Sequence, residues 1–175
     1  MFIRLTLLLT LTLACSVFTP QPTPMDTRPA DFSVRYDWYE GSLPPPYHYE
    51  YSISVDNSGA GVVKMVPDYP SEDVPVFTET FTVEPAALEA LFDQLVEHGA
   101  FTVQWREEDD PPVGGSHAST TLTANGETIE IPSFVVPAQA AAQSEIADAI
   151  NALVPQAVWD RLNAQREAYV EENGG

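Results

Sequence analysis

Cysteine and basic residues are scarce in this chain of 175 residues, which contains one cysteine and seven Lys and Arg residues in total. A lone cysteine cannot form an intramolecular disulfide, so packing alone must hold the folded part together. The basic residues are outnumbered by 26 Asp and Glu residues, and the formal net charge is −19. Binding to a phosphate backbone depends on Lys and Arg that displace counterions. The composition therefore excludes nucleic acid as a partner.

The acidic excess has three interpretations, which the sequence leaves open. A strongly negative surface fits cations, basic proteins or neutral ligands as partners, and it can hold a domain away from an anionic envelope. The second interpretation is that the negative surface serves only to keep the protein soluble. The third interpretation is a high-salt habitat. Salt at ~1 M shortens the screening length to about 3 Å, which makes a dense acidic surface tolerable. Lys64 is the only lysine in the chain, which agrees with that habitat.

Signatures of catalysis and of transition-metal binding are also lacking. The three histidines, at positions 48, 98 and 117, are isolated and form no HExxH motif, which argues against zinc. Ser116 follows Gly114-Gly115 and precedes His117, but this run lacks the G-x-S-x-G spacing of a nucleophile elbow. It is more typical of a strand that starts after a diglycine turn. We therefore favour a binding or interaction module over an enzyme; an envelope hydrolase is the alternative.

No hydrophobic run is long enough to cross a membrane. The longest apolar stretch, residues 5–13, has nine residues, whereas a helix needs about 20 to span a ~30 Å hydrocarbon layer. This stretch follows Arg4 and leads to Ala14 and Cys15. The arrangement resembles a bacterial lipoprotein signal, with Thr12 in the place where that signal usually has leucine.

The resemblance implies a cellular location and no biochemical activity. Residues 1–14 would be the signal peptide, and Cys15 would carry palmitate or a related acyl chain on the extracytoplasmic side of a bacterial membrane. The alternative makes residues 5–13 a core helix and Cys15 a buried thiol. Residues 15–30 contain four prolines and few apolar residues, which predicts an extended tether. Residues 31–175 are then a single globular domain.

Alternating apolar residues predict four strands at the start of this domain. Phe32, Val34, Tyr36 and Trp38 share one face of the first strand. The same period returns in residues 47–55, with His48, Glu50, Ser52 and Ser54 on a polar, solvated face. Residues 61–66 and 76–83 give two more strands. Four consecutive strands favour an antiparallel meander.

Helices and a hairpin follow. Glu84-Pro85 starts a helix that ends at Gly99, with His98 as a terminal cap. Residues 101–105 resume strand alternation, and Asn125-Gly126 predicts a type I′ hairpin that sets Leu122 opposite Ile129 and Thr120 opposite Ile131. Helical spacing over residues 144–154 and 155–170 is divided by Pro155. The order predicts an α+β fold: a mostly antiparallel sheet, meander plus hairpin, with two to three helices packed on one face.

Two candidate sites remain. The acidic run of Glu107, Glu108, Asp109 and Asp110 offers carboxylate oxygens for calcium, although such a run is also typical of a solvated loop. Among the aromatic residues at 36, 38, 39, 47, 49 and 51, only Tyr39 is expected outside the buried faces, which makes it the candidate ligand-binding residue. The sequence thus predicts a membrane-anchored module for an envelope protein or glycan partner.

Overall fold

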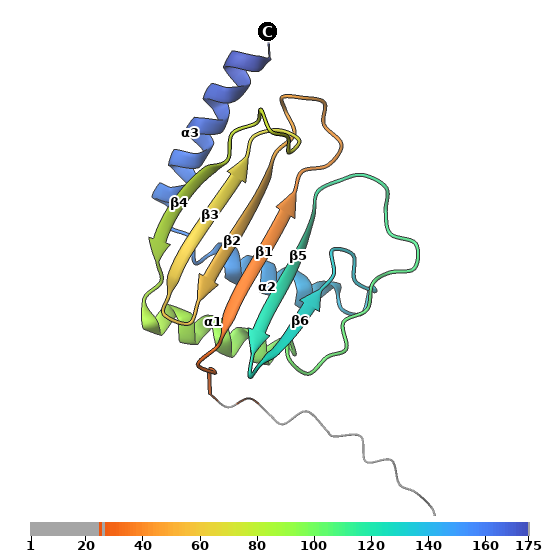
Figure 1. Ribbon diagram of the computed structural model, residues 1–175. Coiled ribbons are helices and arrows are strands. Elements are labelled where there is room, and N and C mark those ends of the chain that lie inside the picture. Colours follow the sequence, from red (N-terminus) through yellow and green to blue (C-terminus); the bar gives the residue numbers. More distant parts are fainter. Residues whose placement is uncertain (1–24, 26, 175) are drawn as a thin grey trace, which may run out of the picture.

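The computed structural model describes Met25 and residues 27–174 (Figure 1). The predicted signal peptide, Cys15 and most of the predicted tether lie outside these residues. Among the described residues, no helix is long and apolar enough to cross a membrane. The elements in chain order are β1 (Ser33–Tyr39), β2 (Glu50–Asp56), β3 (Ala60–Val66), β4 (Phe77–Thr82), α1 (Pro85–Glu97), β5 (His117–Ala124), β6 (Glu127–Ile131), α2 (Ala140–Asn151) and α3 (Gln156–Asn173). The predicted α+β fold is confirmed.

The strands form one six-stranded sheet in the order β4-β3-β2-β1-β5-β6, and every neighbouring pair is antiparallel. The first four strands are the predicted meander. Helix α1 then carries the chain across the back of the sheet, so that the β5–β6 hairpin pairs with the other edge of β1. Figure 1 shows α1 and α2 behind the sheet and α3 along β4. Among the described residues, helices therefore cover one face of the sheet and leave the face toward the viewer uncovered.

The core lies between the sheet and its helices. Alternation turns Phe32 and Val34 inward at the start of β1, and helix α1 presents its apolar stripe to them. The ring of Phe92 meets Phe32 edge to face, with centroids 5.5 Å apart. The fully buried large side chains are Phe32, Phe92, Ile53, Met65, Leu88, Leu91, Leu95, Leu122, Ile131, Ile146, Ile150 and Leu162.

The predicted hairpin is confirmed. Asn125 and Gly126 have φ angles of 54° and 76°, as a type I′ turn requires, and Leu122 pairs with Ile129. The carboxylate of Asp31 accepts hydrogen bonds from the backbone N–H groups of Asn125 (2.8 Å) and Gly126 (2.6 Å). These bonds lower the pKa of Asp31, and the bond from Gly126 lowers it most. The ionised carboxylate thus ties the turn to the residue that leads into β1.

The helix boundaries agree with the predicted signals. Pro85 occupies the first turn of α1, His98 is its C-cap, and Gly99 follows with a φ of +72°. That angle lies in the left-handed region, where glycine is favoured. Pro155 separates α2 from α3, as predicted. Helix α2 begins at Ala140, one turn before the predicted start.

The strand predicted at residues 101–105 is wrong. These residues belong to the long connection that runs from the end of α1 to the far end of β5 (Figure 1). Phe101 packs on Phe92 with ring centroids 5.5 Å apart, and the indole N–H of Trp105 donates to the carbonyl of Ala100 at 3.2 Å. Beyond them, Glu107 and Val135 form only an isolated bridge. Phe101 and Trp105 therefore pack against the core without pairing in the sheet, whereas Val103 is exposed.

The contacts of the domain begin before the predicted boundary at residue 31. Met25 packs against the core. The guanidinium of Arg28 lies 2.9 Å from the Glu89 carboxylate on α1 and donates to the backbone carbonyl of Asn57 at 2.9 Å. Its side chain is only 13% exposed. The end of the predicted tether is thus bound to the bottom of the sheet, where β1 starts.

Candidate functional site

Strand register places three side chains in one row on the uncovered face. Tyr39 ends β1, and its direct partners are Glu50, at the start of β2, and His117, at the start of β5. All three side chains point away from the helices because the neighbouring position in β1, Trp38, turns toward the core. The rings of Tyr39 and His117 stack with centroids 5.1 Å apart and planes at 17°.

His48 lies beside this row and is buried, with 4% of its surface exposed. Its Nε2 is 3.1 Å from the Glu50 carboxylate, and its ring stacks on Tyr69 at 3.8 Å. The Tyr69 hydroxyl donates to the carbonyl of Leu43 at 2.9 Å, which holds the tyrosine over the histidine. The prediction that His48 lies on a solvated face is therefore wrong, because Tyr69 covers it.

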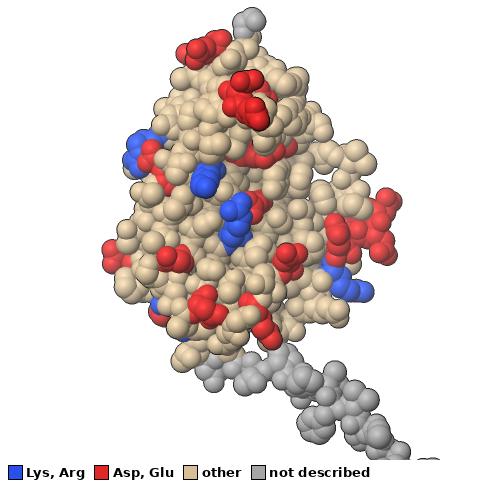
Figure 2. Space-filling model, viewed as in Figure 1, with Lys and Arg blue, Asp and Glu red and all other residues tan. Residues whose placement is uncertain are grey.

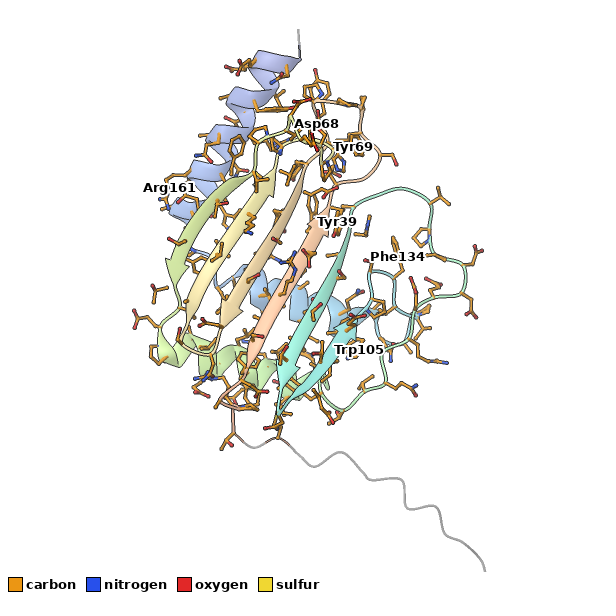
Figure 3. The ribbon with its side chains drawn as sticks, in the orientation of Figure 1. Tyr39, Asp68, Tyr69, Trp105, Phe134 and Arg161 are labelled. Atoms are coloured by element: carbon orange, nitrogen blue, oxygen red, sulfur yellow. The ribbon has the colours of Figure 1, made fainter. Side chains whose placement is uncertain are left out.

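Two further loops complete the surroundings of the row. Phe134, from the loop before α2, approaches His117 with ring centroids 5.5 Å apart. On the other side, a Cβ atom on Gly41 would lie 2.8 Å from the backbone of Gly115, so these two loops meet closely only because Gly41 has no side chain. Figure 3 shows Tyr39 and Tyr69 at the upper ends of the strands, with Phe134 on the connection to their right.

These residues line an open hollow of about 390 Å³, within the range of ligand sites. We call it the aromatic hollow. Its charged lining residues are Glu40 and Glu50, and no Lys or Arg is among the described residues that line it. The full lining is Tyr39, Glu40, Gly41, Ser42, His48, Glu50, Tyr69, Pro112, Gly114, Gly115, His117 and Phe134.

Helix α3 supports the loops that carry this lining. The guanidinium of Arg166 lies 4.1 Å from the ring centroid of Tyr49, the residue between His48 and Glu50. The Asp68 carboxylate accepts a hydrogen bond from the backbone N–H of Tyr69 at 2.7 Å, and the Tyr169 hydroxyl of α3 lies 3.5 Å from its other oxygen. The C-terminal helix therefore braces Tyr49 and the Asp68–Tyr69 turn.

The groups of the aromatic hollow are suited to binding. Burial raises the pKa of the Tyr39 phenol, and the carboxylates of Asp37 and Glu50 raise it further. The phenol is therefore a neutral donor at neutral pH, beside a carboxylate acceptor and aromatic faces. Ser116 is exposed and, within the described part of the chain, makes no hydrogen bond to His117. The pair therefore lacks the contact that would activate a serine nucleophile.

The predicted calcium residues lie in the connection before β5. Glu107 is held by its bridge to Val135, and the backbone N–H of Glu108 donates to the carbonyl of Phe134 at 2.8 Å. Asp109 and Asp110 are exposed. No group of three or more His, Cys, Asp or Glu side chains among residues 25 and 27–174 is arranged to hold a metal ion. Calcium binding at residues 107–110 stays a prediction.

The aromatic residues singled out from the sequence divide between core and surface. Tyr36 is buried, and Tyr51 is half-buried and donates to Asn151 of α2 at 3.0 Å. Tyr47 was expected on a buried face but is 48% exposed, because residues 45–49 form a turn and an irregular segment before β2 starts at Glu50. Tyr39 lines the aromatic hollow. The ring contacts around the hollow join Tyr39 to His117, His117 to Phe134 and His48 to Tyr69. They link distant parts of the chain, and no local pattern signals them.

Comparisons with known proteins assign no family. No protein-family model matches this chain, and no curated protein matches it.

Proposed function

We propose that this chain is an extracytoplasmic lipoprotein whose domain binds a ligand in the aromatic hollow. The observation that carries the proposal is the convergence of aromatic rings from four separate segments, at Tyr39, Tyr69, His117 and Phe134, on one open hollow. Rings that line a surface hollow offer large apolar faces without closing over them. Such an arrangement is typical of a recognition site.

The position of the hollow fits attachment through Cys15. The described chain enters at the bottom of the sheet in Figure 1, next to the start of β1, whereas Tyr39 is the last residue of that strand. A seven-residue strand separates the two ends by about 20 Å. A domain held to a membrane by its N-terminal side would therefore present the aromatic hollow away from the lipid surface.

An envelope glycan is the ligand that these groups favour. The apolar faces of sugar rings stack on tyrosine and phenylalanine. Sugar hydroxyls would bond to the Glu50 carboxylate and to the phenol of Tyr39, which stand side by side in the strand register. The lack of Lys and Arg in the described lining favours a neutral or cationic ligand over an anionic one.

Saccharide binding by the full chain tests this proposal. We expect the protein, in micelles of a polyoxyethylene detergent that carries neither sugar nor ammonium, to bind members of a panel of bacterial envelope saccharides. Tyr39→Leu and Tyr69→Leu should each weaken that binding by about tenfold, because each removes an aromatic face. Tyr47→Leu is the matched control, since Tyr47 is an exposed tyrosine outside the lining. Unchanged binding by a folded Tyr39→Leu variant would rule out the hollow as the site.

A further inference from the structure

We infer that the group seated in the aromatic hollow is an organic cation of the alkylammonium class. The inference rests on the proposed function. It narrows the ligand from a neutral or cationic molecule to one that carries an organic cation. It follows from a charge balance: the hollow contains two carboxylates and several aromatic faces, but no Lys or Arg among the lining residues that the structure describes. Both features attract a positive charge, and they act at the same place.

The aromatic faces supply the first part of the attraction. A cation within about 6 Å of a ring centroid is drawn to the negative face of the π system, and the effect grows when the cation is desolvated. Tyr69 stacks on His48 with one face but remains 43% exposed, so its other side is available. Tyr39 and Phe134 each pack on His117, and all three rings line the hollow.

The carboxylates supply the second part. Glu50 lies opposite Tyr39 in the register, and its side chain is only 20% exposed. Glu40 is oriented by a hydrogen bond that its carboxylate accepts from the backbone N–H of Gly41 at 2.9 Å. Partly buried carboxylates interact with a nearby cation more strongly than exposed ones, because water screens them less.

Two described basic residues near the hollow, Arg35 and Arg166, are already engaged. The guanidinium of Arg35 bonds to the Asp37 carboxylate at 2.7 Å, and that of Arg166 lies on the face of Tyr49. His48 is the one described side chain within hydrogen-bond distance of the Glu50 carboxylate. Glu40 and Glu50 therefore have no Lys or Arg partner in the described part of the chain. A ligand cation would complement both.

An inorganic ion fits the hollow less well than an organic one. Calcium takes six to eight oxygen ligands, whereas the described residues bring no three His, Cys, Asp or Glu side chains together as a metal site. An alkylammonium group does not require a complete shell of oxygen ligands. Aromatic faces and nearby carboxylates are sufficient for it.

Choline and its neutral isostere, 3,3-dimethylbutan-1-ol, test the inference by isothermal titration against the full chain in polyoxyethylene micelles. The two molecules share shape and hydroxyl group and differ in the charge. We expect choline to bind at least about tenfold more tightly. Glu50→Gln should remove most of that difference, and it keeps an oxygen that accepts from His48. Glu97→Gln, which removes the same charge from α1 on the covered side of the sheet, should leave both affinities unchanged.

Each outcome decides the inference. Preferential binding of choline that depends on Glu50 and Tyr39 supports it. Equal binding of choline and the isostere overturns it, as does a parent that binds saccharides in a Tyr39-dependent manner but not choline; in both cases the hollow remains the site. Binding of choline that Tyr39→Leu and Glu50→Gln leave unchanged also overturns it. Thermal unfolding of each variant distinguishes a loss of binding from a loss of fold. Glu40→Gln provides a second variant if Glu50→Gln is unstable.

Discussion

Phe92→Ala is expected to lower the free energy of unfolding by about 4 kcal/mol, because it replaces a buried aromatic ring with a methyl group. Phe92 is 2% exposed. Its ring contacts Phe32 at the entry to β1 and Phe101 in the connection to β5, each with centroids 5.5 Å apart. Alanine would leave a cavity where helix, sheet and connection meet. Urea unfolding of the full chain, followed by circular dichroism, measures the change.

Val96→Ala is the matched control for Phe92. Val96 lies on the same helix but is 38% exposed, so its truncation should cost less than about 1 kcal/mol. Similar, small losses for both variants would contradict the packing of α1 on the sheet. A large loss confined to Phe92→Ala would support it.

Cys15→Ser is expected to release the protein from membranes completely, because the proposed attachment is one lipidated residue. A buried acyl chain contributes about 0.8 kcal/mol per methylene, and the described part of the chain has no helix able to replace it. Fractionation of expressing cells measures the release, and metabolic labelling with a palmitate analogue measures acylation. The labelling is unambiguous, since Cys15 is the only cysteine.

Ser16→Ala is the control for this experiment, because it alters the neighbouring residue and keeps the thiol. We expect this variant to stay labelled and membrane-bound. If Cys15→Ser remained in the membrane fraction without label, attachment through that cysteine would be wrong. Without that N-terminal attachment, the aromatic hollow would no longer be expected to face away from the lipid surface.

The architecture was predictable because its determinants are local. Alternation along Ser33–Tyr39 fixes which side chains face the helices, and the Asn125-Gly126 pair fixes the hairpin register. Pro85 and Gly99 mark the ends of α1. Each of these signals lies within a few residues of the structure that it specifies. The wrong strand prediction at residues 101–105 shows the limit of such local signals. The apolar residues there contact the end of α1 and the residue after it instead of a neighbouring strand.

The candidate site was mostly unpredictable, because it consists of contacts between distant segments. Sequence alternation separated Tyr39 from the core, but only the pairing of three strands brings Glu50 and His117 beside it. Tyr69 covers His48 from a loop that follows β3. Nothing near His48 in the sequence indicates that cover. Figure 2 shows acidic side chains spread over the uncovered face, so net charge alone does not locate the site.

Backbone amide shifts of the glycines test the central claim, that the aromatic hollow is the ligand site, most directly. Gly41, Gly114 and Gly115 line the hollow, whereas Gly59 and Gly126 lie in turns at the opposite ends of the strands. In ¹⁵N-labelled full chain titrated with choline or with the tightest-binding saccharide, the account predicts saturable shifts at the first three glycines and none at Gly59 and Gly126. Saturable shifts at Gly59 or Gly126 with none at Gly41, Gly114 and Gly115 would contradict it.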